Sequence, residues 1–214
     1  PSQGSPWGDR YPTPGVSPRG TLVPLALDVA VLRRTDDGVE ALADGAVVHD
    51  GSGPDEAADA LRVWFRTSAD AWVYVISIDA VGRVQPLFPT SFPTGPVPAN
   101  TGVLLPGGEH WYGLDRYAGL EHVYFYASLE PNAELEAKLA PLAGRPVPSL
   151  SGQVHTVSER TVLETPAITT RGLTNVRPVA LADVAGAPAP LEVARYRQIG
   201  DAKGVMATRV LEHR

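Results

Sequence analysis

Residues 61–128 read LRVWFRTSADAWVYVISIDAVGRVQPLFPTSFPTGPVPANTGVLLPGGEHWYGLDRYAGLEHVYFYAS, and we expect the hydrophobic core to be built from this stretch. The stretch holds all four phenylalanines and three of the four tryptophans of the chain. Leu61, Val63 and Phe65 occupy alternate positions, and this period of two is typical of a β-strand with one face in the core. The stretch therefore predicts a sheet.

Residues 71–78 predict a central strand, because apolar side chains occupy both of its faces and both faces are then covered. The segment 79–82 predicts a turn, in which Gly82 supplies a positive φ. Residues 83–88 follow as the returning strand. Pro86 has no backbone N–H to donate, so we expect this strand to lie at a sheet edge or to be bulged at Pro86.

Further short strands are predicted at 103–105, 110–114 and 121–128, with segments rich in proline and glycine between them. In the last of these strands, alternate residues face opposite sides of the sheet. Many short strands at close spacing favour a mainly β fold. We expect an antiparallel β-sandwich, of the immunoglobulin-like or a related type.

The order of motifs in this stretch resembles a bacterial family of unknown function, DUF4384. The shared pattern is a strand, an Ile-Asp-x-x-Gly turn, a second strand and Leu-Phe-Pro, which here is AWVYVISIDAVGRVQPLFP at residues 71–89. A loop with Asn100 and a Leu-Pro-Gly segment follow, and the resemblance covers roughly residues 61–128. It implies a compact β-sandwich-like domain of the kind found in envelope proteins. It implies no agreed activity and no catalytic residues.

The flanking segments add strands and one helix to this sandwich. Residues 21–34 predict a strand, and residues 39–43 and 46–49 predict two short strands of a meander. Residues 132–142 predict a helix with a stripe of leucines and Asn132 as its N-cap. We expect this peripheral helix to pack over one end of the sandwich.

The sequence divides into a sandwich domain at residues 21–145 and a C-terminal extension at residues 146–214. Segments 191–199 and 205–212 flank a glycine-containing break, which predicts a terminal β-hairpin. No long linker separates the segments, so we expect the extension to pack on the same domain.

The first 20 residues are rich in proline, glycine and serine, and they cannot form a helix or a central strand. Residues 1–20 are interpreted as a linker or as an arm. In the second interpretation the arm docks on a neighbouring subunit, and Trp7 and Tyr11 are its anchors.

Composition excludes several classes of protein. The formal net charge is −6 and the arginines are scattered, which argues against a nucleic-acid-binding protein. No apolar run is long enough to span a membrane as a helix. Cysteine is absent, so there is neither a disulfide framework nor a thiol nucleophile. The proline-rich beginning and the family resemblance favour an extracytoplasmic location, in the periplasm, the envelope or outside the cell.

Aromatic residues are the only constellation that suggests a binding site, because aromatic side chains are enriched in binding surfaces. The alternative, which we favour, is that they are core residues and cross-strand pairs. The candidates for this surface are Trp72, Tyr74, Trp111, Tyr112, Tyr124 and Tyr126.

No pattern predicts an active site. The five histidines lack the close spacing of metal ligands, so we expect no metal and no cofactor. A site assembled from His110, His122 and Asp115 is the alternative. Ser151 lies near His155 but lacks the glycines of a nucleophile elbow, and is interpreted as a turn residue.

Two functional hypotheses follow. The first is a non-enzymatic module that acts through protein–protein contact, binding a partner or a second copy by its arm at 1–20 or by its edge strands. The alternative is a small-ligand-binding or hydrolytic domain whose loops at 89–100 and 107–119 wall a pocket.

Overall fold

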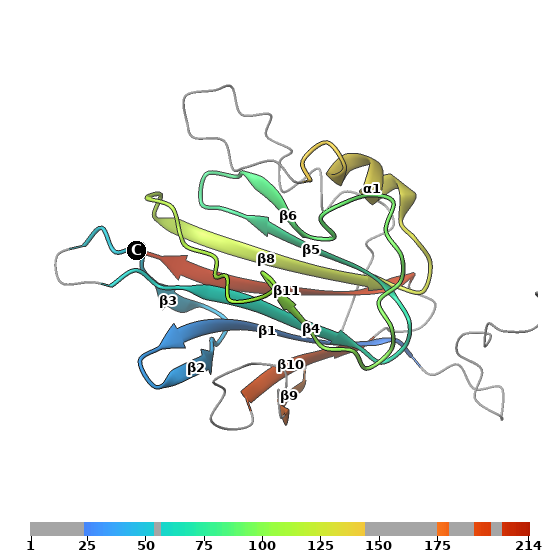
Figure 1. Cartoon of the computed structure of the whole chain (residues 1–214), viewed down its shortest axis with the longest axis horizontal. Coiled ribbons are helices and arrows are strands. Elements are labelled where there is room, and N and C mark those ends of the chain that lie inside the picture. The colour runs from blue at the N-terminus through green and yellow to red at the C-terminus, as the bar shows by residue number, and fades with distance from the viewer. Residues whose placement is uncertain (1–23, 54–56, 144–174, 180–190, 198–202) are drawn as a thin grey trace, which may run out of the picture.

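The computed structural model describes residues 24–53, 57–143, 175–179, 191–197 and 203–214, which form two β-sheets packed face to face (Figure 1). The first, called the β1 sheet, has the strand order β7 (Val103–Leu105), β4 (Leu61–Thr67), β1 (Ala26–Thr35), β10 (Leu191–Arg197) and β9 (Asn175–Val179), with β2 (Gly38–Ala41) also paired to β1. The second, called the β8 sheet, has the order β3 (Ala46–Val48), β11 (Gly204–His213), β8 (Gly119–Ser128), β5 (Trp72–Ile78) and β6 (Val84–Phe88). The predicted mainly β sandwich is confirmed.

The core lies between the two sheets and is built from alternate residues of each strand. Val63 and Phe65 of β4 share one buried cluster with Val73 of β5 and Phe125 of β8. The Phe65 and Phe88 rings pack with their centroids 5.3 Å apart. The period of two in the sequence therefore identified the inner face of β4 correctly, whereas for β5 and β8 it separated the two faces without telling which of them lies between the sheets.

The β5–β6 connection has the predicted form. Gly82 has a φ of +79°, and its N–H donates to the Asp79 carbonyl at 2.9 Å. β6 lies at the edge of the β8 sheet, and the β5–β6 register shifts between Val75 and Ile76, opposite the segment that contains Pro86. The edge position and the irregularity both accommodate the missing N–H of Pro86.

The helix α1 (Ala133–Leu139) begins after Asn132, whose side chain accepts a hydrogen bond from the Leu135 N–H at 3.0 Å. Leu135 and Leu139 are fully buried against the outer face of the β8 sheet (Figure 1). The helix therefore covers a face of that sheet, and not an end of the sandwich as predicted. The reason is that β5 and β8 also carry apolar side chains on their outer face, and α1 buries them.

The C-terminal strands do not form the predicted hairpin. β10 pairs with β1 and β9, whereas β11 pairs with β8 and β3, so the two strands lie in different sheets. Every residue of β11 has a partner on β8, from Gly204 opposite Ser128 to His213 opposite Gly119. This long ladder satisfies more backbone groups than pairing with the shorter β10 would.

Two further strand predictions are wrong. β2 and β3 are not consecutive strands of one meander, because β3 crosses to the β8 sheet and pairs in parallel with β11. Residues 110–114 form no strand and contribute only an isolated bridge, in which Tyr112 pairs with Leu61. No helix in the described part of the chain is long and apolar enough to cross a membrane.

A buried carboxylate ties three strands of the β1 sheet together. Asp28 of β1 is 1% exposed and lies opposite Arg66 of β4 and Arg195 of β10. Arg66 donates to it at 2.9 Å, and Arg195 donates to both of its oxygens at 2.5 and 2.7 Å. Charge-assisted hydrogen bonds of this kind are among the stronger ones in proteins, so Asp28 fixes the position of β10 relative to β1.

Candidate functional site

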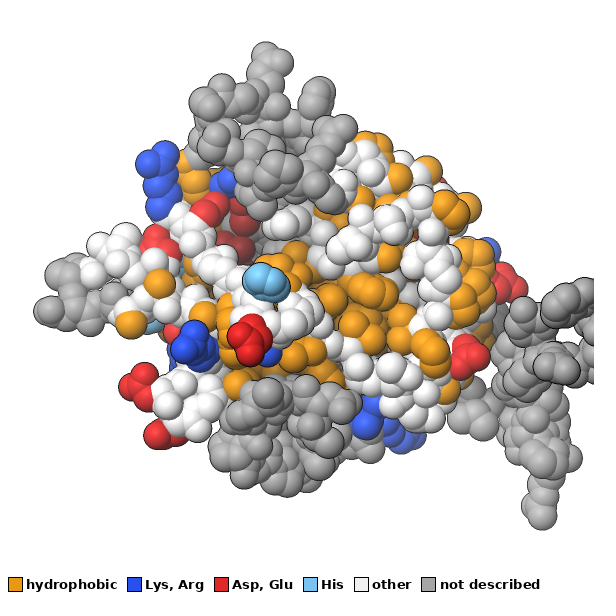
Figure 2. Space-filling view, viewed as in Figure 1, with side chains coloured by type: hydrophobic (Ala, Val, Ile, Leu, Met, Phe, Trp, Pro, Cys, Tyr) orange, Lys and Arg blue, Asp and Glu red, His pale blue; other side chains and the backbone are white. Residues whose placement is uncertain are grey.

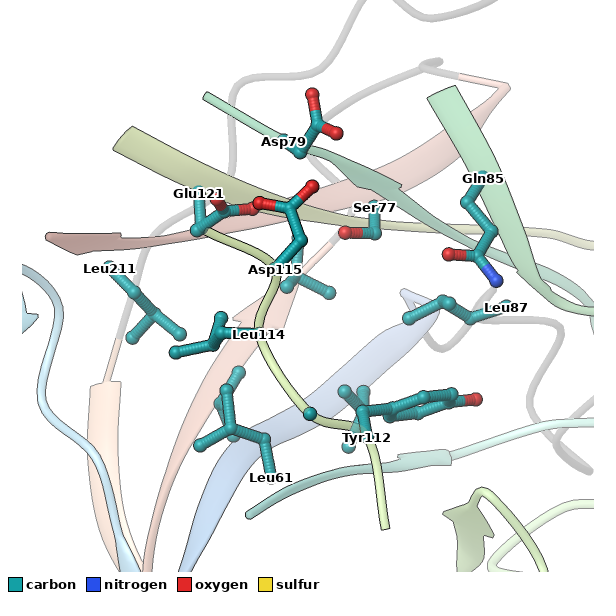
Figure 3. Close-up of a pocket in the computed structure, with 14 residues that line it drawn as sticks. Leu61, Ser77, Asp79, Gln85, Leu87, Tyr112, Leu114, Asp115, Glu121 and Leu211 are labelled. Atoms are coloured by element: carbon teal, nitrogen blue, oxygen red, sulfur yellow. The ribbon is translucent and has the colours of Figure 1, made fainter. Parts of the chain in front are cut away.

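A cavity of about 230 Å³ lies between the two sheets, where the segment after β7 crosses from one sheet to the other (Figure 3). Figure 2 shows hydrophobic side chains gathered at the centre of the face on which Figure 1 places strands of both sheets. The cavity is lined by residues of β1, β4, β5, β6, β8 and β11, of the β5–β6 turn and of the loop that precedes β8: Val31, Leu61, Val63, Ser77, Asp79, Gln85, Leu87, Tyr112, Gly113, Leu114, Asp115, Glu121, Val123 and Leu211.

The two walls of the cavity differ in polarity. The β1 sheet contributes Val31, Leu61 and Val63, which are all apolar. The β8 sheet contributes three apolar residues, Leu87, Val123 and Leu211, and three polar ones, Ser77, Gln85 and Glu121. Ser77 and Glu121 stand at positions where the same strands elsewhere carry buried apolar residues. Ser77 of β5 lies directly opposite Gln85 of β6, and both line the cavity (Figure 3). The cavity is thus amphipathic.

Residues 112–115 close one side of the cavity and are anchored to β4. Tyr112 exchanges two backbone hydrogen bonds with Leu61, each of 2.8 Å. Arg62 is 5% exposed, and its guanidinium donates to the carbonyls of His110 and Gly108 at 2.9 and 2.7 Å. These bonds explain why a segment with no strand of its own has a defined position.

Two salt bridges join residues 112–115 to the β5–β6 turn. The Arg83 guanidinium lies 2.6 Å from Asp115 Oδ2 and 2.7 Å from Asp79 Oδ2. It also lies over the Tyr117 ring, 5.1 Å from the centroid. Arg83 is 8% exposed, so its pairs are screened little by water. These salt bridges fix the carboxylates of Asp79 and Asp115 at the rim of the cavity (Figure 3).

Glu121 is the most deeply buried carboxylate of the lining, at 8% exposed. Its Oε1 accepts a long hydrogen bond of 3.3 Å from the Ala80 N–H and lies 3.5 Å from His213 Nδ1. Burial raises the pKa of Glu121 above its ordinary value, and the negative charges of Asp79 and Asp115 add to that effect. The hydrogen bond from Ala80 and the proximity of His213 act in the opposite direction.

His213 lies beside Glu121 and is buried. Its side chain is 1% exposed, and its Nε2 lies 3.9 Å from Asp50 Oδ2. The ring therefore lies between the carboxylates of Asp50 and Glu121. At these distances the contacts are electrostatic rather than hydrogen bonds.

The predicted aromatic surface is not a single surface. Tyr74, Tyr124 and Tyr126 are at most 5% exposed and pack against Leu135 and Leu139 of α1. The rings of Tyr74 and Tyr126 stack with their centroids 6.0 Å apart. These three tyrosines are therefore core residues and cross-strand pairs, which is the alternative that the sequence favoured.

The other three aromatic candidates lie in three different places. Trp72 is half-buried near α1, and its Nε1–H donates to the Thr94 carbonyl at 3.2 Å. Trp111 lies under the Arg62 guanidinium, which is 4.2 Å from the ring centroid. Only Tyr112 lines the cavity. The arm anchors Trp7 and Tyr11 lie outside the described residues.

Of the two loops predicted to wall a pocket, only the loop at 107–119 does so. The loop at 89–100 folds onto the start of β5, where Val97 pairs with Ala71. The alternative metal set is not assembled either. His110 is exposed, His122 stacks on Tyr124 at 5.9 Å, and Asp115 binds Arg83. Within the described part of the chain, no three or more His, Asp or Glu side chains are arranged to hold a metal ion.

Ser77, Gln85 and Glu121 were not predicted as site residues. Each is a polar residue at an inward-facing position near the end of its strand, in an otherwise apolar series. This signal is present in the sequence, since Ser77 follows Ala71, Val73 and Val75 at intervals of two. A single polar end of a strand is common, however, and only the pairing of the strands brings the three residues together. The hydrolytic candidates Ser151 and His155 lie outside the described residues.

These features define a β-sandwich with an amphipathic cavity at the contact of its two sheets. Residues 56–131 match the model of the family described as Domain of unknown function (DUF4384), which confirms the resemblance seen in residues 61–128. No curated protein and no solved structure matches the chain. The matched segment contains β4 to β8, whereas Val31 and Leu211 of the cavity come from strands outside it.

Proposed function

We propose that this protein is a non-enzymatic module that binds a small molecule in the cavity between its sheets. The observation that carries the proposal is the cavity of about 230 Å³, in which one wall is apolar and the other carries polar residues among apolar ones. Small-molecule sites in proteins are concave and lined mostly by apolar side chains, with a few polar groups that orient the ligand. An engineered apolar cavity of about 150 Å³ in another protein holds benzene, so the present volume suits a ligand slightly larger than one aromatic ring.

The polar side chains of the cavity support binding rather than catalysis. Among the described residues, neither the Ser77 hydroxyl nor the Gln85 amide has a hydrogen-bond partner. Both side chains are half-buried and line the cavity, so a ligand there can exchange hydrogen bonds with them. Ser77 also has no histidine hydrogen-bonded to it among these residues, and a serine without such a base is a weak nucleophile. No enzyme family supports a hydrolytic function.

Protein–protein contact through strand addition is less well supported. The edge strands β3 and β7 have three residues each. Among the described strands the remaining edges are β2, which has four residues, and β6 and β9, which contain Pro86 and Pro178. Short edges and edge prolines discourage the pairing of another chain. The arm at 1–20 lies outside the described residues, and its docking and the extracytoplasmic location remain predictions from the sequence.

The proposal is tested by titrating the 15N-labelled full chain with three matched probes: 2-phenylethylamine, 2-phenylethanol and phenylacetate. At concentrations up to about 10 mM, we expect at least one probe to shift the amide signals of Ser77, Gly113 and Glu121 saturably. The variant Ser77→Phe fills the cavity from its polar wall and should abolish the shifts. The exposed Ser91→Phe is the matched control and should leave them unchanged.

Two results would contradict the proposal. The first is that none of the three probes shifts these amides. The second is that Ser77→Phe, shown to be folded by its own amide spectrum, binds the probes as well as the original chain does.

A further inference from the structure

We propose that the cavity selects ligands that carry one protonated primary amine, with the ammonium group against Glu121 and the apolar body against the β1 sheet. The inference rests on the proposed binding function and specifies the chemical class of the ligand. It follows from the charge balance of the cluster around the cavity, from the polar side chains of its lining and from the size of the cavity.

The cluster around the cavity holds more negative than positive groups. Its carboxylates are Asp50, Asp79, Asp115 and Glu121, and its cationic partners are Arg83 and His213. Counting His213 as protonated leaves two more ionised carboxylates than cations, and counting Arg209 as well leaves one. Arg209 lies on β11 opposite Val123 of the lining, and its Nε is buried. Buried charges are normally paired, so a ligand that adds a positive charge lowers the cost of this arrangement.

The rim carboxylates differ in how well they are satisfied. Asp79 Oδ1 accepts hydrogen bonds from the N–H groups of Val81 and Arg83 at 3.0 and 2.8 Å, and its Oδ2 pairs with the Arg83 guanidinium. Asp115 accepts from the Tyr117 N–H at 2.9 Å and from Arg83 at 2.6 Å. Both carboxylates therefore have their partners within the protein and stay at the rim.

Glu121 has only weak partners. Apart from the long bond from Ala80 and the 3.5 Å contact with His213, it has no polar contact with another described residue. It lines the cavity at 8% exposed, so bulk water solvates it poorly. An ammonium group placed in the cavity supplies the hydrogen bonds and the countercharge that this carboxylate lacks.

The rest of the polar wall suits an ammonium group better than a metal ion. An ammonium has three N–H donors and no acceptor, and the Ser77 hydroxyl and Gln85 amide oxygen offer further acceptors in the lining of the same cavity. A metal ion needs several oxygen ligands converging on one point, and the described part of the chain has no such group. The same carboxylates disfavour an anionic ligand because like charges repel.

The size of the cavity limits the apolar part of the ligand. If about 150 Å³ holds the six carbons of benzene, the present volume accommodates about nine non-hydrogen atoms. A single ring with a two-atom arm that ends in nitrogen matches both this volume and the two unlike walls. 2-Phenylethylamine has this shape. 2-Phenylethanol differs from it only in the neutral hydroxyl group, and phenylacetate carries a negative charge at the same end.

The test measures the dissociation constants of these three probes for the full chain at pH 7 by isothermal titration calorimetry or amide shifts. We expect the amine to bind about tenfold more tightly than the alcohol, and phenylacetate to bind most weakly. Glu121→Gln keeps the shape of the side chain and removes its charge. This variant should bind the amine and the alcohol equally, while its affinity for the alcohol stays within about twofold.

Glu109→Gln is the matched control, because Glu109 is an exposed carboxylate in the same loop and the substitution changes the net charge equally. It should leave the preference for the amine intact. If Glu109→Gln lowers the affinity for the amine as much as Glu121→Gln does, long-range attraction explains the preference, and the role of Glu121 is overturned. The role is equally overturned if the preference survives in Glu121→Gln.

The outcomes separate this inference from the proposed function. If the alcohol or phenylacetate binds in the cavity as tightly as the amine, the amine selectivity is refuted while the binding function stands. If no probe binds there, the proposed function itself fails.

Discussion

Replacing Asp28 with asparagine is expected to lower the free energy of unfolding by about 2–3 kcal/mol. Asp28 is 1% exposed, and its carboxylate is the shared acceptor of Arg66 and Arg195. Removing one partner of a fully buried ion pair costs about 3–5 kcal/mol. The side chains of Arg66 and Arg195 are 23% and 22% exposed, so water partly solvates their charges once the carboxylate is gone. The expected cost of Asp28→Asn is therefore the smaller value of about 2–3 kcal/mol.

Urea denaturation of the full chain followed by tryptophan fluorescence measures this difference. Thermal unfolding followed by the same signal should show a decrease in the melting temperature of about 4–12 °C for a protein of this size. Glu40→Gln is the matched control, because Glu40 also pairs with an arginine on the neighbouring strand but is 46% exposed. That exposed pair should contribute less than about 1 kcal/mol.

A double-mutant cycle with Arg195→Gln tests whether the effect belongs to the contact between β1 and β10. We expect the two substitutions to be non-additive by at least about 1 kcal/mol. The reasoning is refuted if Asp28→Asn costs no more than Glu40→Gln, or if the effects of Asp28→Asn and Arg195→Gln simply add. Either result would mean that this charged cluster does not hold β10 against β1.

Two predictions concern other buried polar groups. The raised pKa of Glu121 means that the folded state holds its proton more tightly than the unfolded state, so stability falls as the pH rises from the ordinary value of 4.5 through the folded one. Glu121→Gln should make the free energy of unfolding less dependent on pH in this range. If the free energy of unfolding, measured by urea titration at several pH values, falls as steeply in Glu121→Gln as in the original chain, Glu121 is not the group responsible. Tyr74→Phe removes a hydroxyl that donates to Glu136 at 2.7 Å and accepts from the Asn132 N–H at 3.1 Å, so it should cost about 1–2 kcal/mol in the same assay. A cost near zero would mean that this hydroxyl does not anchor α1.

Local features of the fold could be predicted because they depend on neighbours in the sequence. The strand at β5, the turn at Gly82 and the N-cap at Asn132 follow from periodicity, backbone freedom and a side-chain acceptor. Pro86 even indicated a sheet edge, because its missing N–H is a property of the residue itself.

The candidate site was predicted only in part, through the loop at 107–119. Its polar wall needs Ser77, Gln85 and Glu121 to be neighbours, and their strands are adjacent only through the β6–β5–β8 pairing. The sequence marks each of these positions as polar within an apolar series. It does not state which strand lies beside which, so the three positions could not be combined into a site.

The class of fold, the alternation of side chains along several strands and the family segment could be predicted from the sequence. The assignment of β10 and β11 to different sheets, and the cavity between those sheets, became visible only in the folded structure. The alternation of side chains tells which face of a strand is buried but not what buries it. Strand pairing and cavity walls depend on contacts between residues far apart in the chain, and no local pattern encodes those contacts.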